Sequence, residues 1–309
     1  MSASPSVSEF EFLGEEAAEF AIPLPSPPVV RRVSVDGGAT SALVWGDEPA
    51  QIAFLHGGGL NAHTWDATTM ALGRPVVALD LPGHGDSAWR DDLDYRAEVI
   101  APAAASALGQ LAPDAVAVVG QSLGGLTAIA VAGQRPDLVA ALVIVDVSPG
   151  LVVGDGNQVR DFLAGPESFA TREEIVERAA SFGFAVSRAA LARGVFLNTR
   201  VRDDGQIVFK HHLANRGGGE PVLGTDFRSL WPTLEQYDNP VLLVRATRGF
   251  LSDEVVDEFM ARVPGAELAT IDAGHNVQED APVELAAAIN GFVVGRPPGR
   301  RRRPTAAGP

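Results

Sequence analysis

The chain has 309 residues, 46% of them hydrophobic, with 33 glycines and 22 prolines, which suits one large α/β domain with an insertion, or two domains. Its net charge of −15 disfavours nucleic acid as a partner of the folded body. Because it has no cysteine, it has no disulfide, no thiol nucleophile and no thiolate metal site, and it fits a reducing compartment.

Residues 1–28 form an acidic and then proline-rich N-terminal segment, with a short amphipathic helix expected at about 8–20. This segment carries five glutamates and lacks the basic and apolar regions of a secretory signal. The longest nearly unbroken apolar run, 138–147, is shorter than the roughly 20 residues that a membrane-spanning helix needs. We therefore expect a soluble, cytoplasmic protein without stable membrane insertion.

Short apolar segments predict a sheet of eight strands. The predicted strands are 29–35, 41–45, 52–55, 76–79, 115–119, 142–145, 241–244 and 268–271. The first two flank Asp36-Gly37-Gly38, whose glycines suit a hairpin turn. Helical segments alternate with the later strands, for example at 95–111, so we expect a mostly parallel sheet with helices on both faces.

Residues 150–237 depart from this alternation and are expected to form an inserted, mainly helical cap. Thr171-Arg172-Glu173-Glu174 has the form of a capping box and predicts a helix to about 182, and 187–197 predicts a second helix. The core would then consist of 29–149 and 238–295, with the cap over the carboxyl edge of the sheet, where ligands bind in open α/β sheets. The arginine-rich residues 296–309 are expected to be a disordered basic tail.

The pentapeptide Gly120-Gln121-Ser122-Leu123-Gly124 lies between a predicted buried strand and a predicted helix. Gly-x-Ser-x-Gly in this context is the pattern of a nucleophile elbow, in which a tight turn holds the serine hydroxyl outward. A Cβ two residues before or after the serine would clash, so both positions need glycine. The alternative, a glycine-rich turn that contains serine by chance, is weakened by the rest of the chain.

A serine hydroxyl needs a base to remove its proton and a third group to orient that base. His275 follows the last predicted strand, in Asp272-Ala273-Gly274-His275-Asn276, so its loop would bring it to the same sheet edge as Ser122. An ordinary core or surface histidine is the alternative. The position after a strand and the chain order of serine, acid and histidine favour the catalytic role.

The motifs Leu55-His56-Gly57-Gly58-Gly59, 79–87, the elbow and Ala273-Gly274-His275 resemble the α/β-hydrolase superfamily, and the resemblance covers nearly the whole chain. The segments 193–198 and 60–65 resemble an actinobacterial, mycobacterial-type subgroup of carboxylic-ester hydrolases. This resemblance implies the α/β-hydrolase fold and cleavage of a small-molecule carboxylic ester through an acyl-enzyme, without metal or cofactor.

The acid is where the chain departs from the commonest pattern of this superfamily, because the loop expected after the seventh strand, 245–252, has no carboxylate. Asp146 ends the sixth predicted strand, a position that some members use, and would lie one strand away from Ser122. Asp253 is the alternative, although Ser252-Asp253-Glu254 reads as a helix start. We expect Asp146, rather than Asp253, to be the acid.

Stabilisation of an oxyanion requires N–H donors that are already in place. We expect these to be the backbone N–H groups of Leu123 and Gly58, with Gly58 preferred over Gly59. Four aromatic residues are candidates for the lining of the substrate pocket, with ordinary packing as the alternative. They are Trp65, Phe196, Trp231 and Phe250.

The other histidines receive no catalytic role. His56, His63 and His84 are expected to brace their loops. His211 and His212 are adjacent, and neighbouring residues rarely face one ion, so we predict no metal site.

Two other readings of function remain beside ester hydrolysis. The same triad could act on a lactone, a thioester, a carbon–carbon bond or a peracid. A protein that binds a small ligand could also retain a hydrolase pocket without activity.

Overall fold

The computed structural model describes residues 8–24, 26–152, 161–162, 165–182, 187–215 and 219–294. Its centre is an eight-stranded sheet in the order β1-β2-β4-β3-β5-β6-β9-β10, in which β2 alone runs against the other strands. The strands are Val30–Val35, Thr40–Trp45, Val76–Leu79, Ile52–Leu55, Ala117–Gln121, Leu142–Val145, Val241–Arg248 and Glu267–Gly274, in that spatial order. The predicted, mostly parallel sheet of eight strands is confirmed.

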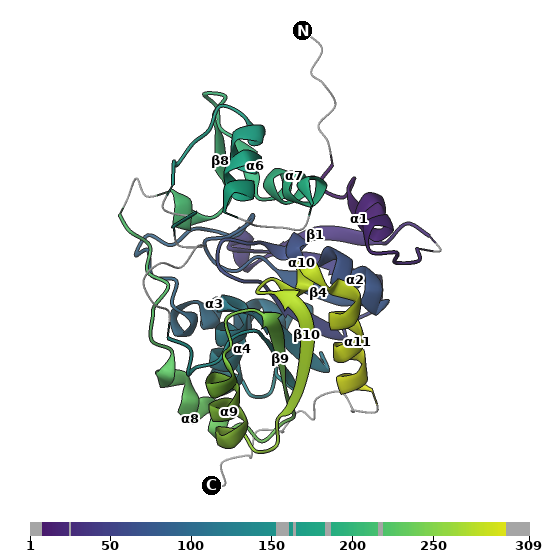
Figure 1. Ribbon diagram of the computed structural model, residues 1–309, viewed down its shortest axis with the longest axis vertical. Helices are drawn as coiled ribbons and strands as arrows, with labels where there is room; N and C mark the ends of the chain where they lie inside the picture. The colour runs from purple at the N-terminus through teal and green to yellow at the C-terminus, as the bar shows by residue number, and fades with distance from the viewer. Residues whose placement is uncertain are drawn as a thin grey trace.

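Helices cover both faces of the sheet (Figure 1), because alternate side chains of each strand point to opposite sides. In β3, Ala53 and Leu55 join one apolar layer, whereas Ile52 and Phe54 join the other. The first layer includes α3 (Ala97–Leu111), α4 (Leu123–Gln134), α8 (Trp231–Glu235) and α9 (Asp253–Arg262). The second includes α1 (Leu13–Glu19), α2 (Asp66–Leu72), α10 (Val277–Asp280) and α11 (Pro282–Val293).

The inserted segment forms a cap with a small apolar core of its own. It contains α6 (Arg172–Ser181), α7 (Arg188–Leu197) and the hairpin of β7 (Thr199–Val201) and β8 (Ile207–Phe209). Thr171 and Ser187 cap the two helices by accepting hydrogen bonds from backbone N–H groups, and for Thr171 the capping-box pattern predicts this bond. Figure 1 shows the cap at one end of the molecule, with α1 beside α7.

The last two strands are longer than their apolar segments predict. Residues 245–248 continue β9 and pair with β10, so the expected loop after this strand begins only at Gly249. Polar side chains are tolerated there because the paired segments are largely exposed. Helix α2 was also not predicted, since β-branched Thr68 and Thr69 weaken its helical signal.

The predicted turn at 36–38 is a single 3₁₀ turn, η1 (Asp36–Gly38), that joins β1 to β2. The predicted basic tail, 296–309, lies outside the described residues. Among the residues that the structure does describe, no helix is both long enough and apolar enough to cross a bilayer.

Candidate active site

Ser122 occupies a strained turn between β5 and α4. Its φ of 51° and ψ of −119° are rare for a residue other than glycine. A Cβ on Gly120 would lie 2.3 Å from the carbonyl oxygen of Gly124, and a Cβ on Gly124 would lie 2.1 Å from that of Leu55. The prediction that both positions require glycine is therefore confirmed.

Asp146 and His275 form a hydrogen-bonded pair at the carboxyl edge of the sheet. The His275 Nδ1 lies 2.8 Å from Oδ2 of Asp146, whose side chain is fully buried. The Asp146 carboxylate also accepts hydrogen bonds from the N–H groups of Ala246 (3.1 Å) and Phe250 (2.8 Å). A carboxylate that only accepts requires the proton of His275 to be on Nδ1, so Nε2 is the ring nitrogen left with a free lone pair.

The His275 loop is fastened to the nucleophile turn. The side-chain N–H of Gln121, the residue before Ser122, donates to the carbonyl oxygen of His275 at 3.1 Å. The Phe250 ring stacks on one face of the imidazole, with a centroid separation of 3.7 Å and an interplanar angle of 16°. The imidazole is thus held at Nδ1, through its backbone and across one face.

Asp253, the alternative acid, lies elsewhere. Its side chain is 80% exposed and forms an ion pair with Arg245 at 2.5 Å. It is the first residue of α9, whose N-cap is Ser252, as the helix-start reading of this segment predicts. The structure therefore brings Asp146, and not Asp253, to the imidazole of His275.

The loop after β3 makes a tight turn against the nucleophile. The Leu60 N–H donates to the Gly57 carbonyl oxygen at 3.2 Å, and Gly59 has a φ of 79°, which suits the third position of such a turn. A Cβ on Gly57 would lie 2.2 Å from Oε1 of Gln121 and 3.4 Å from Cβ of Ser122. A larger residue at position 57 would displace the side chain of Gln121, which also bonds to the His275 loop.

His56 fixes the orientation of this turn. Its Nδ1 donates to the Gly57 carbonyl oxygen at 2.8 Å, and its Nε2 accepts a hydrogen bond from the Leu81 N–H at 2.9 Å. Burial lowers the pKa of His56, in keeping with the neutral ring that these two bonds require. Because the carbonyl and N–H of a trans peptide point in opposite directions, the bonds to the Gly57 carbonyl also set the direction of the Gly58 N–H.

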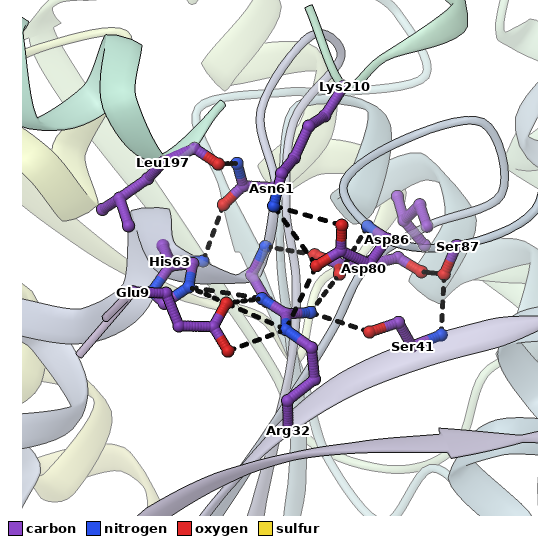
Figure 2. A network of polar contacts seen from close by, with 12 residues as sticks. Glu9, Arg32, Ser41, Asn61, His63, Asp80, Asp86, Ser87, Leu197 and Lys210 are labelled. Carbon is purple, nitrogen blue, oxygen red and sulfur yellow. Dashed lines mark hydrogen bonds and ion pairs between the residues drawn. The ribbon is translucent and has the colours of Figure 1, made fainter. Parts of the chain in front are cut away.

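Figure 2 shows a cluster of charged residues around Arg32. Arg32 binds the buried Asp80 at 2.6 Å and Glu9 of the N-terminal segment at 2.8 Å. Asp80 in turn accepts hydrogen bonds from the N–H groups of Ala62, at 2.8 Å, and Asp86, at 3.0 Å. This cluster joins the N-terminal segment, β1 and the loops after β3 and β4.

Two of the other histidines also contact their own loops, as predicted. His84 Nδ1 lies 3.0 Å from the Pro82 carbonyl oxygen, and His63 Nδ1 lies 2.7 Å from Asp66. Although burial opposes it, Asp66 and Glu9 raise the pKa of His63 to about 9.

The neighbouring histidines of the cap face different surroundings. His211 stacks on Phe209, and burial lowers its pKa to about 3. His212 stacks on Trp89, and its Nδ1 lies 2.6 Å from the Tyr95 hydroxyl oxygen. Across the described residues, no group of three His, Cys, Asp or Glu side chains could hold a metal ion.

The four candidate pocket aromatics do not gather around Ser122. Trp65 is fully buried and stacks on Phe54 in the core, and Trp231 is 3% exposed and packs on Phe259. Phe196 packs edge-on against Phe12 of the N-terminal segment. The proposed contact of these three with substrate finds no support in their positions, and Phe250 alone lies at the Asp146–His275 pair.

Three cap residues at the predicted oxyanion turn were not anticipated. Leu223 and Leu213 are the nearest neighbours of a Cβ built on Gly58, at 3.7 and 3.9 Å, and Asn198 Nδ2 donates to the Gly59 carbonyl oxygen at 2.6 Å. No local pattern marks such contacts, because they join segments more than a hundred residues apart. The one available signal was the resemblance of 60–65 and 193–198 to a single subgroup, and Asn61 contacts Leu197 and Asn198 in the structure.

Comparison with known proteins identifies the family. Residues 52–288 match the model of the alpha/beta hydrolase family. The chain belongs to the α/β-hydrolase family. The resemblance predicted from the motifs is thereby confirmed.

This α/β hydrolase is similar to two proteins of Mycobacterium tuberculosis. It is 37% identical to the esterase Rv0045c over 93% of this chain and 96% of that protein, and 31% identical to the lipase LipV over 78% and 92%. A crystal structure of the same esterase superposes with a TM-score of 0.81 and covers 93% of this chain and 98% of that one. A thioesterase domain from the curacin biosynthetic pathway, with a TM-score of 0.69 and 20% identity, shares the fold.

Proposed function

We propose that this α/β hydrolase is a serine esterase that cleaves carboxylic esters of small molecules through an acyl-enzyme. The observation that carries the proposal is the hydrogen bond of 2.8 Å between His275 and the buried Asp146. The loop of His275 also accepts a hydrogen bond from Gln121, the residue before Ser122. The similar proteins named an esterase and a lipase support an ester as the substrate.

In the first half of the reaction, the Ser122 hydroxyl attacks the ester carbonyl while Nε2 of His275 takes its proton. Asp146 holds the ring in the required tautomer and stabilises the imidazolium. The imidazolium then gives its proton to the departing alcohol, which leaves an acyl group on Ser122. Water attacks this acyl group by the same route and releases the acid.

Two backbone N–H donors are assigned the role of stabilising the negative charge on the tetrahedral intermediate. These are the N–H of Leu123, at the start of α4, and the N–H of Gly58. The bonds that fix the Gly57 carbonyl support the second assignment, since they orient the peptide that carries this N–H. Leu213 and Leu223, which lie over Gly58, would present an apolar surface to the bound ester.

Labelling with a fluorophosphonate tests this proposal. The wild-type protein is expected to be labelled and to hydrolyse p-nitrophenyl esters, and Ser122→Ala is expected to lose the label and nearly all turnover. The residual rate of Ser122→Ala would come from binding and the oxyanion donors alone. A folded wild-type protein that neither reacts with the probe nor hydrolyses any ester of a graded acyl series would contradict the proposal.

A further inference from the structure

The cap is tied to the oxyanion turn by two asparagines. Asn198, directly after α7, donates from Nδ2 to the Gly59 carbonyl oxygen at 2.6 Å. Asn61, at the other end of the turn, donates to the carbonyl oxygen of Leu197 at 3.2 Å and to Oδ1 of Asn198 at 3.3 Å. Figure 2 shows Asn61 between His63 and Leu197, reaching from the core to the cap.

These bonds add to those that hold Gly58, the residue whose N–H is assigned as an oxyanion donor. The Gly57 carbonyl, before Gly58, is held by His56 and by the Leu60 N–H. The Gly59 carbonyl, after it, is held by Asn198, which belongs to the cap. Because glycine restricts its own backbone least of all residues, a turn of three successive glycines depends on such external bonds for a fixed conformation.

Contacts with the N-terminal segment hold helix α7 in place and thereby fix the position of Asn198 directly after it. Its buried Arg193 binds Glu19 at 2.9 Å and lies 3.7 Å from Glu16, both of α1. Its Phe196 packs against Phe12 just before α1. The N-terminal segment therefore fixes the position of α7, and α7 presents Asn198 to the turn.

We propose that Asn198 is a positioning residue of the oxyanion hole, through which the cap holds the Gly58 N–H in its active orientation. The proposal rests on the function proposed above. Its consequence is that the cap does more than cover the substrate: with the bond from Asn198 broken, Ser122 and His275 remain in place but the tetrahedral intermediate loses part of its stabilisation.

The test compares Asn198→Ala with Asn215→Ala. Asn215 is a matched control because its side-chain N–H also donates to backbone carbonyls, those of Phe209 and His211, but only inside the cap. Each variant is assayed for kcat and KM on a p-nitrophenyl ester and for binding of phenylboronic acid. The boronic acid forms a tetrahedral, negatively charged adduct with the nucleophilic serine and so reports on the oxyanion hole.

For Asn198→Ala we expect kcat and the affinity for the boronic acid to fall together by about 10-fold, less than the 10²- to 10³-fold that follows complete loss of an oxyanion donor. KM is expected to change less than twofold, and Asn215→Ala should match the wild type in all three. Asn198→Leu, which keeps the side-chain volume, repeats the test if Asn198→Ala does not fold.

Three outcomes would overturn the inference: an unchanged Asn198→Ala, an effect on KM alone, or an equal loss in Asn215→Ala. In each of these cases, wild-type protein that binds the boronic acid and reacts with the fluorophosphonate leaves the proposed function intact. Wild-type protein that does neither contradicts the proposed function itself.

Discussion

Ser122 and Asp146 both have a positive φ. They are two of the five described residues other than glycine that have a positive φ, at 51° and 49°. Such strain costs of order 1–3 kcal/mol at each position, and it persists where the surrounding structure holds the residue firmly. Around Asp146 that structure includes Gly249, on which a Cβ would lie 2.1 Å from the carboxylate.

Asp146→Asn is expected to lower kcat by about 10²- to 10⁴-fold. Oδ1 of Asp146 accepts from the Ala246 N–H, whereas Oδ2 faces both the Phe250 N–H and Nδ1 of His275. An amide whose oxygen keeps the bond from Ala246 therefore turns its nitrogen toward Nδ1 of His275. The proton of the imidazole is then driven to Nε2, where it blocks base catalysis. Steady-state kinetics on a p-nitrophenyl ester measures the effect.

Asp253→Asn is the matched control, because it removes the other candidate carboxylate from an exposed position. Its turnover is expected to stay within twofold of the wild type. The assignment of the acid would be wrong if Asp253→Asn, and not Asp146→Asn, lost activity.

At the scale of elements, α1 joins the core to the cap. Leu13 and Ala17 are buried against the core, whereas Glu16 and Glu19 face Arg193 of α7. The side chain of Arg193 is 7% exposed, so its partners compensate for nearly complete loss of water. The cap is therefore attached to the core at both the N-terminal segment and the oxyanion turn.

Arg193→Gln is expected to loosen the contact between α1 and α7. Loss of a hydrogen bond between charged groups costs on the order of 2 kcal/mol, and the carboxylate of Glu19, left without this partner, adds to this cost. Hydrogen exchange should become faster in α1, α6 and α7, and remain unchanged in β5 and α4. Arg188→Gln, on the same helix, is the control, because Arg188 is exposed and its partners among the described residues, Glu173 and Glu177, belong to the cap.

The sequence patterns predicted the elements whose signal is local. The elbow at 120–124, the cap at Thr171 and the apolar strands depend on neighbours within a few residues, and all appear in the structure. The sequence could not show which aromatic residues contact a ligand, because the local pattern around a residue such as Trp65 is the same whether it faces the core or a ligand. The bond from Asn198 to Gly59 was equally out of reach, since it joins positions 139 residues apart.

For the molecule as a whole, the charges around the N-terminal segment predict how stability depends on pH. Burial, together with the nearby Asp66, raises the pKa of Glu16 to about 8, and the pKa of His63 is raised to about 9. Burial works against ionisation of Glu9, but hydrogen bonds from His63 and Arg32 lower its pKa to about 2. Glu9 and His63 join the N-terminal segment to the core, and Glu16 faces Arg193 of the cap.

Stability is expected to fall at both ends of the pH range. A raised pKa gives stability that is complete below the unfolded value and lost as the pH rises through the folded value, so His63 loses its contribution between about 6.5 and 9. Glu16 acts in the same direction between 4.5 and about 8, whereas the contribution of Glu9 is lost as the pH falls from 4.5 to about 2.

Calorimetric unfolding between pH 3 and 9.5 measures this profile. Between about pH 6.5 and 8, where Glu16 and His63 act together, the unfolding temperature should decline as the pH rises. The decline should be less steep in Glu16→Gln, which removes one of the two titrations. An unfolding temperature that stays constant to pH 9, or an equal decline in Glu16→Gln, would contradict this account.

The backbone hydrogen bonds between neighbouring strands continue to Ser122 and Asp146, the residues that directly follow β5 and β6. The Ser122 N–H donates to the Val145 carbonyl at 3.2 Å, and the Asp146 N–H donates to the Val244 carbonyl at 2.8 Å. The distance between the backbones of these residues is thus set by the repeat between adjacent strands, about 4.8 Å, and by no connecting loop. In related chains, insertions and deletions can accumulate in the connections, the cap included, without changing the spacing of nucleophile and acid.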